Sequence, residues 1–223
     1  MKRVLIVGAG GFGRELLSYC SEHPANGREW QVGGFIDDNE GALERWNYVQ
    51  PVVASVASYV PSEDDLLICA IGNPALKRRI CGELLAKGAT FGSFIHPRAV
   101  VGLNVKIGIG VVLCPNVTLT CDIEVGNFVA INCSSSVGHD SVVGAYTTIN
   151  GACEITGGVH LGEEVFFGAR AVVIPGLSIG DHAVIGAGSV VIQNVKAGET
   201  VFGNPARTLV VKKRESADNL QDR

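Results

Sequence analysis

A histidine followed directly by an aspartate, His139-Asp140, is the residue pair in this sequence best suited to acid–base chemistry. The unperturbed pKa of a histidine side chain is about 6.5, so the imidazole can take up a proton near neutrality. A neighbouring carboxylate can orient the ring and raise its basicity. The same pair also occurs in ordinary surface turns, so the residues alone leave open both a general base and a solvated turn.

A glycine-rich loop and a pair of aspartates point to a phosphate-containing ligand. The loop Gly8–Gly13 follows an apolar run and precedes a segment with helical spacing, and backbone N–H groups at a helix start suit a phosphate. A dinucleotide fingerprint would need an acidic residue about twenty positions further on, whereas Asp37-Asp38 come somewhat later. The loop therefore indicates a nucleotide ligand and is weak evidence for NAD.

The composition argues against several classes of protein. A net charge of −4, with no run of Lys and Arg longer than three, argues against nucleic-acid binding. Seven cysteines, an odd number without a C-x-x-C pair, are typical of reduced thiols in a cytoplasmic protein. The apolar run at residues 4–7 is interrupted by Gly8, so we expect no signal peptide. The longest charge-free run, 107–121, is broken by Gly, Asn and Pro and is too short to span a bilayer, so we expect no membrane insertion.

The second part of the chain, which must position His139, repeats every six residues. Every sixth position from Ile95 to Val191 is apolar, seventeen in all, and glycine or asparagine fills eleven of the positions that follow them. Six residues rotate a side chain by about 240° in an α-helix, which would spread the apolar set around its surface. In extended chain an even period keeps the set on one side. The repeat predicts a β-solenoid, with the glycines and asparagines at corners of positive φ.

The first part of the chain, which carries the glycine loop, alternates between strand and helix patterns. Strands are predicted over residues 3–7, 31–36 and 66–71, and helices over 12–22 and 75–86, with Pro74 near the first turn of the second helix. Alternation of this kind predicts a small parallel sheet flanked by helices.

Together these motifs resemble the bacterial sialic-acid O-acetyltransferase and nucleotide-amino-sugar N-acetyltransferase family, in which three hexapeptide repeats form one triangular coil. The resemblance is carried by Gly8–Gly13, Phe35-Ile36-Asp37-Asp38, Ala70-Ile71-Gly72-Asn73, Asn132 with Gly138-His139-Asp140, Ile155-Thr156-Gly157-Gly158 and Gly203-Asn204-Pro205-Ala206-Arg207. It implies a small α/β Rossmann-like nucleotide-sugar-binding domain over residues 1–93. A left-handed parallel β-helix of five to six coils would follow over residues 94–211, and we expect a polar tail over residues 212–223.

The activity implied by the resemblance is acetyl transfer from acetyl-CoA to the 4-amino group of a nucleotide-linked 4-amino-4,6-dideoxy sugar, in surface-glycan synthesis. His139 would be the general base, Asp140 its support, and Asn132 a residue near the acceptor. The nucleotide sugar would contact Gly10, Gly11, Phe12, Asp37, Asp38 and Gly72. Acetyl-CoA would contact Thr148, Gly157, Ala169, Ala187, Pro205 and Arg207, with the Gly157 N–H meeting the thioester carbonyl.

Two positions depart from the family pattern. Thr148 stands nine residues after His139, where family members often have a second histidine near the coenzyme, and Phe12 replaces a frequent histidine in the glycine loop. A threonine hydroxyl can form hydrogen bonds but cannot carry charge. Neither change removes the proposed base.

Zinc binding by three histidines, as in γ-class carbonic anhydrases of similar fold, is the weakest alternative. His139, His160 and His182 sit two, five and three residues past the apolar position of their repeats, so they are expected to point in different directions. Zinc needs ligands that converge at about 2.0–2.1 Å. We therefore expect no metal within one subunit.

Two further alternatives remain open at this point. The acceptor could be a sugar hydroxyl instead of an amine, because both reactions need the same base. The chain could also be a non-catalytic, sugar-nucleotide-binding scaffold whose β-helix only trimerises. In either case the flat faces of a triangular prism, together with the resemblance, predict a homotrimer.

Overall fold

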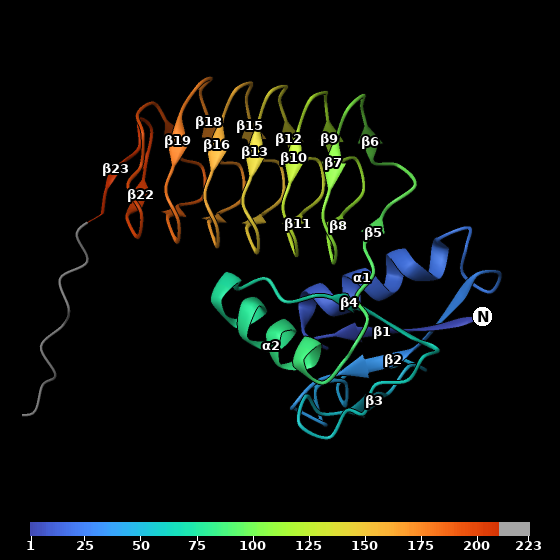
Figure 1. Cartoon of the computed structure of the whole chain (residues 1–223). Coiled ribbons are helices and arrows are strands. Elements are labelled where there is room, and N and C mark those ends of the chain that lie inside the picture. Colours follow the sequence, from blue (N-terminus) through green and yellow to red (C-terminus); the bar gives the residue numbers. More distant parts are fainter. Residues whose placement is uncertain (210–223) are drawn as a thin grey trace, which may run out of the picture.

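The computed structural model describes residues 1–209 and places a small α/β part beneath a prism of stacked coils (Figure 1). The predicted tail over residues 212–223 and the last two residues of the predicted β-helix domain, 210 and 211, lie outside the described residues. The α/β part holds a four-stranded parallel sheet of order β3-β2-β1-β4. Its elements in chain order are β1 (Lys2–Val7), α1 (Gly11–Glu22), β2 (Trp30–Ile36), β3 (Val52–Ala54), β4 (Asp65–Cys69) and α2 (Pro74–Ala86).

The two helices cover opposite faces of this sheet because the side chains of β1 alternate between them. Val4 and Ile6 pack in one cluster with α1, while Leu5 and Val7 pack in another with α2. The sequence predicts every element of this part except β3. That short edge strand has only three residues, none of them fully buried, and so it carries no clear alternation.

Helix α2 begins at Pro74 because two local signals coincide there. The Asn73 side chain accepts a hydrogen bond from the Leu76 N–H at 2.9 Å, which satisfies one free donor of the first turn. Pro74 occupies the first helical position, where no N–H is needed. The start of α2 lies close to the solenoid, so these signals also set where the α/β part meets it.

Residues 94–191 form a left-handed solenoid of seventeen two-residue strands, β5 to β21, arranged as three parallel sheets (Figure 1). One coil takes eighteen residues, since Ala130 pairs with Val112 below it and with Thr148 above it. The predicted hexapeptide solenoid is therefore confirmed. We call the sheet that faces the α/β part the docked sheet, and the other two the second and the third sheet.

The docked sheet faces the α/β part and contains β5 (Phe94–Ile95), β8 (Val112–Leu113), β11 (Ala130–Ile131), β14 (Thr148–Ile149), β17 (Phe166–Phe167), β20 (Val184–Ile185), β22 (Thr200–Phe202) and β23 (Arg207–Thr208). The second sheet contains β6 (Val100–Val101), β9 (Thr118–Leu119), β12 (Ser136–Val137), β15 (Glu154–Ile155), β18 (Val172–Val173) and β21 (Val190–Val191). The third sheet contains β7 (Lys106–Ile107), β10 (Glu124–Val125), β13 (Val142–Val143), β16 (His160–Leu161) and β19 (Ser178–Ile179). The turns that join the second sheet to the third form the far edge, opposite the docked sheet.

The apolar sixth positions fill the prism, as their period predicts. From Leu113 to Val191 none of them is more than 4% exposed. Ile95 and Val101, in the first coil, are 38% and 39% exposed because no coil lies below them. One inward side chain per strand is therefore enough to build the core once coils are stacked on both sides.

The predicted place of positive φ was wrong by two residues. Positive φ occurs three positions after every inward residue from Val101 to Ile185, often at side-chain-bearing residues such as Asp140 (φ 60°) and Tyr146 (φ 61°). The glycines directly after the inward residue are needed for a different reason, which is the close approach of the next coil. A Cβ at Gly138 would lie 2.5 Å from the Gly157 nitrogen, and one at Gly102 would lie 1.5 Å from the Thr120 carbonyl oxygen.

Within residues 1–209, neither helix has the length and hydrophobicity needed to cross a lipid bilayer.

Candidate active site

His139 lies in the turn between β12 and β13, on the far edge, with its side chain 65% exposed. Its Nδ1 is 2.7 Å from Oδ2 of Asp140. An ionised carboxylate can only accept hydrogen bonds, so Nδ1 donates and Nε2 keeps the lone pair. The positive φ of Asp140 turns the chain at this point and brings the two side chains together. This arrangement orients an accessible base.

Gly157 occupies the same corner one coil further on and faces the free nitrogen of that base. A Cβ at position 157 would lie 2.6 Å from Nε2 of His139 and 2.7 Å from its Cε1. The missing side chain therefore makes room for the imidazole. Among the described residues no backbone acceptor is bonded to the Gly157 N–H. A free donor beside a free base is the arrangement that acyl transfer to an amine needs.

Asn132 is not brought to His139 within one subunit. It lies in the turn between β11 and β12, at the edge that joins the docked sheet to the second sheet. Its side-chain amide donates to Oδ1 of Asn150 at 3.0 Å, and Asn150 donates to the Phe167 carbonyl oxygen at 2.7 Å. Asn132 is therefore half-buried in a ladder of amides that binds successive coils.

A pocket of about 260 Å³ opens at the carboxyl ends of β1, β2 and β4 in the α/β part. Gly8, Gly10, Asp37, Asp38 and Arg79 contribute to its lining. Ligands of parallel α/β sheets bind at this end, beside the first turn of a helix. The size and position suit part of a nucleotide.

The two aspartates hold the walls of this pocket. Asp37 accepts from the Ala9 N–H at 2.7 Å and from the Asn39 N–H at 2.8 Å, which fixes the glycine loop. Asp38 accepts from the Val56 N–H at 2.8 Å. Their remaining acceptor capacity is what a ligand's N–H or hydroxyl groups would meet.

The other residues predicted to contact the nucleotide sugar lie near the pocket but do not line it. Gly11 begins α1 and is exposed, and Phe12 is half-buried against the core. Gly72 lies between β4 and α2 and is half-buried. The structure thus gathers Gly10, Asp37 and Asp38 into one pocket. Gly11, Phe12 and Gly72 lie near the pocket, outside its lining.

The residues predicted to contact acetyl-CoA fall at three places on the solenoid. Ala169 and Ala187 are exposed in consecutive coils of the edge that joins the docked sheet to the second sheet. Gly157 lies across the second sheet, on the far edge. Pro205 and Arg207 are exposed beside the last coil, where Arg207 donates to the Ala206 carbonyl oxygen at 2.9 Å.

Thr148 lies away from all of these, inside the contact between the α/β part and the docked sheet. It is fully buried, and its hydroxyl oxygen accepts a hydrogen bond from Nζ of Lys77 at 2.7 Å. A buried hydroxyl with this partner has no surface to offer a coenzyme. Lys77 was not among the predicted site residues, and its only signal in the sequence is a lysine among the apolar positions of α2.

The pocket and the base are separated within one chain. The α/β part lies against the docked sheet, for example through Tyr19, whose hydroxyl is 3.3 Å from Sγ of Cys133. The turn that carries His139 lies on the far edge of the prism (Figure 1).

The histidines of the solenoid are spread over separate places as well. His139 lies on the far edge, His160 in β16 of the third sheet and His182 in the turn after β19. Over residues 1–209 no group of three or more His, Cys, Asp or Glu side chains is arranged to hold a metal ion.

Two family models match the chain. Residues 3–84 match the PglD N-terminal domain, and residues 158–193 match the hexapeptide repeat of succinyl-transferase. The UDP-N-acetylbacillosamine N-acetyltransferase of Bacillus subtilis (strain 168) is 30% identical over 120 residues, which are 51% of this chain and 51% of that protein. The chain thus spans about half the length of the curated relatives that it matches.

Solved structures match over nearly the whole chain. WeeI from Acinetobacter baumannii AYE is 30% identical, with a TM-score of 0.83, over 94% of this chain and 100% of that one. PerB from Caulobacter crescentus, solved in complex with CoA and GDP-perosamine, is 29% identical with a TM-score of 0.81, over 94% of this chain and 98% of that one. The similarity therefore includes both the α/β part and the solenoid.

Proposed function

The chain belongs to the family of left-handed β-helix, hexapeptide-repeat sugar acetyltransferases that carry a PglD-type N-terminal domain, and from this we propose its reaction. It transfers the acetyl group of acetyl-CoA to the 4-amino group of a nucleotide-linked 4-amino-4,6-dideoxy sugar, for surface-glycan synthesis. The observation that carries the proposal is the orientation of His139, with Asp140 on Nδ1 and the Gly157 corner beside Nε2.

In the proposed reaction the neutral amine attacks the thioester carbonyl carbon, and Nε2 of His139 takes the proton that the amine loses. Asp140 stabilises the resulting imidazolium through its bond to Nδ1. The Gly157 N–H donates to the carbonyl oxygen as negative charge develops on it. When the carbon–sulfur bond breaks, the imidazolium returns its proton to the CoA thiolate, which leaves an amide and free CoA.

We assign substrate binding to residues 1–93 and chemistry to residues 94–211, of which 210 and 211 lie outside the described part. The pocket with Gly10, Asp37 and Asp38 takes the nucleotide. CoA follows the second sheet from Gly157 towards the exposed end of the solenoid, where Arg207 can meet a phosphate. The complex of PerB with CoA and GDP-perosamine supports the pairing of these two substrates.

Because the pocket and His139 lie on different sides of one prism, we propose a homotrimer in which one subunit's pocket delivers the sugar to a neighbour's far edge. Closed threefold packing brings different edges of neighbouring prisms together and would join the separated parts of the site. All seven cysteines are free thiols, which fits a reducing compartment, and we place the enzyme in the cytoplasm.

The test is release of CoA thiol from acetyl-CoA with UDP-, dTDP- and GDP-linked 4-amino sugars, each beside its 4-hydroxyl analogue. We expect turnover with one amino sugar and little with its hydroxyl analogue. His139→Ala should keep the fold and CoA affinity and lose about 10²–10⁴-fold in kcat, the usual contribution of a positioned base. The assignment of His139 is wrong if the variant keeps more than about a third of wild-type kcat at saturating substrates.

A further inference from the structure

We propose that α2 is a positioning element that fixes the nucleotide pocket relative to the catalytic solenoid, with Lys77 and Arg78 as its charged contacts to the solenoid. The inference rests on the proposed function, because a position matters only if the α/β part delivers the acceptor. Lys77 and Arg78 touch neither substrate, and they still determine how fast nucleotide-linked acceptors are turned over.

Lys77 binds the outer surface of the solenoid, at the edge between the third sheet and the docked sheet. Its ammonium group is buried and donates to the Phe128 carbonyl oxygen at 3.0 Å, the Thr147 carbonyl oxygen at 3.3 Å and Oγ1 of Thr148 at 2.7 Å. Burial lowers the pKa of this amine to about 8, so it is still charged at neutral pH. All three of its donors are used, and all three acceptors belong to the solenoid. A buried cation with no spare donor holds one geometry.

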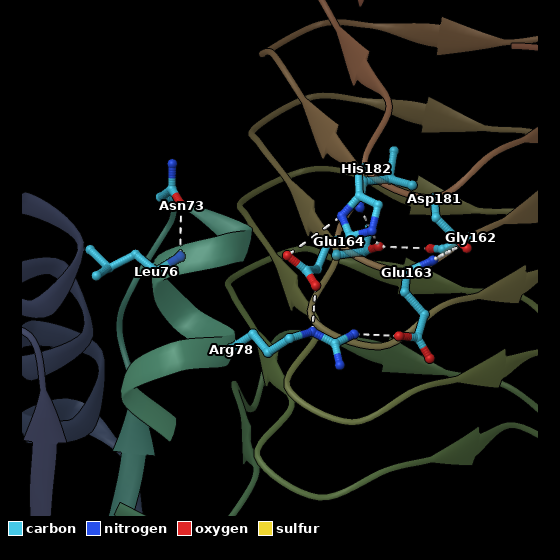
Figure 2. A network of polar contacts seen from close by, with 10 residues as sticks. Asn73, Leu76, Arg78, Gly162, Glu163, Glu164, Asp181 and His182 are labelled. Carbon is cyan, nitrogen blue, oxygen red and sulfur yellow. Dashed lines mark hydrogen bonds and ion pairs between the residues drawn. The ribbon is translucent and has the colours of Figure 1, made fainter. Parts of the chain in front are cut away.

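Arg78, the next residue, binds the outside of the same edge (Figure 2). Its guanidinium forms ion pairs with Glu163 and Glu164, both in the turn between β16 and β17. The Glu164 side chain is only 9% exposed and also lies 3.6 Å from Nδ1 of His182. The guanidinium carbon sits 4.4 Å from the centre of the Tyr146 ring. These contacts span two further coils beyond the one that Phe128 belongs to.

Neighbouring residues of the same stretch of α2 line the nucleotide pocket. Leu76, Arg79 and Ile80 contribute to that lining, and they flank the pair that binds the solenoid. A helix cannot move one of these sets of residues without moving the other. Nucleotide position and docking are therefore mechanically linked through α2.

A sugar whose nucleotide is bound in the pocket is tethered to the α/β part, and this tether speeds the reaction only if it places the amine correctly. A misplacement of the amine by about 1 Å can lower the rate on the order of 10²-fold. An acceptor without a nucleotide gains nothing from the tether. Disturbing Lys77 should therefore slow the nucleotide-linked sugar and spare the untethered one, whereas general damage to the enzyme would slow both.

The experiment compares Lys77→Met with wild type on two acceptors: the best UDP-, dTDP- or GDP-linked 4-amino sugar, and the methyl glycoside of the same amino sugar. We expect kcat for the linked acceptor to fall about 10–100-fold, with kcat/KM for the methyl glycoside within twofold of wild type. The double variant Glu163→Gln/Glu164→Gln removes the two ion pairs of Arg78 from the solenoid side, leaves the α/β part intact and replaces Lys77→Met if that variant does not fold. We expect it to act in the same direction.

Arg3→Met is the matched control. Arg3 donates to both carboxylate oxygens of the buried Asp65, at 2.7 and 2.9 Å, at the amino ends of β1 and β4 and away from the nucleotide pocket. Its loss removes charged hydrogen bonds from the α/β part without touching the docking contact, so kcat for the linked acceptor should stay near wild type. Equal losses on both acceptors in Lys77→Met, or no loss on either, would overturn the proposal.

Hydrogen exchange tests the same link without acetyl transfer. Binding of UDP, dTDP or GDP should slow exchange in peptides that cover residues 126–149 of wild type, and this protection should be lost in Lys77→Met. If nucleotide slows exchange equally in both proteins, α2 does not couple the two parts. Absence of acetyl transfer by wild type to every acceptor would instead refute the proposed function, and the exchange result would still decide on the coupling.

Discussion

Replacing Gly157 by alanine is the sharpest test of the geometry around the base. The new Cβ would stand 2.6 Å from Nε2 of His139, where ordinary van der Waals contact begins at 3.4 Å. One of the two groups must therefore move by about 0.8 Å. The imidazole is the one that can yield, because its side chain is 65% exposed, whereas the backbone of residue 157 lies in the stacked coils.

The expected cost falls on catalysis. Moving the ring carries Nε2 away from the amine, disturbs the 2.7 Å bond to Asp140, and places a methyl group where the acyl group would approach. Since a displacement of about 1 Å can cost on the order of 10²-fold, we expect kcat to fall by roughly 30–100-fold. Folding should change little, because an exposed ring can rotate without leaving a cavity.

The assay is kcat with acetyl-CoA and the best nucleotide-linked amino sugar, together with the urea midpoint of each protein. Gly151→Ala is the matched control, because Gly151 holds the equivalent corner position one hexapeptide earlier. Its nearest neighbour beyond the adjoining residues would be the Cys133 carbonyl oxygen, 3.4 Å from the new Cβ. If Gly157→Ala keeps more than half of wild-type kcat, the imidazole does not work from the position described.

Three further outcomes are expected. Asp140→Asn should lower kcat by less than His139→Ala, because it removes the support of the ring and leaves the base; an equal loss in the same assay would give Asp140 a different role. Asp65 is 2% exposed and is bonded by Arg3 (2.7 and 2.9 Å) and by the Tyr59 hydroxyl (3.0 Å), so Asp65→Asn should lower the free energy of unfolding by about 1.5–3 kcal/mol in urea. The hydrogen bond from Arg3 lowers the pKa of Asp65 in the folded protein. The stability that ionised Asp65 contributes is therefore complete above the unfolded pKa of about 3.9 and is lost as pH falls through the lower folded pKa. A difference in unfolding free energy between wild type and Asp65→Asn that persists unchanged in stronger acid would contradict this. Light scattering should give three times the chain mass, and a fully active monomer would refute the trimer.

Much of the architecture follows from the sequence by itself. A period of six is even, so an extended chain must place Ile95, Val191 and the positions between them on one side, whatever else surrounds them. The alternation of the first part likewise predicts a parallel sheet with helices on both faces. The pair His139-Asp140 is also local, because neighbouring residues at a tight turn can reach each other without help from distant chain.

The role of the glycines could not be read from one repeat. Their regular occurrence suggested corners with positive φ, but the turn is made two residues later, at Asp140 and its equivalents. What excludes a side chain at Gly138 is the backbone of the next coil, 2.5 Å from where a Cβ would stand. That neighbour is nineteen residues away and exists only once the coils are stacked.

The placement of the other predicted site residues was decided by the tertiary structure. The family resemblance implied a coenzyme contact for Thr148, yet Lys77 buries it, because α2 docks on the strand that contains it. Asn132 and His139 are seven residues apart in sequence, but one side of the prism separates their turns. Side-chain spacing determines which way a residue points within its own coil, whereas docking of the α/β part determines which of those directions still faces solvent.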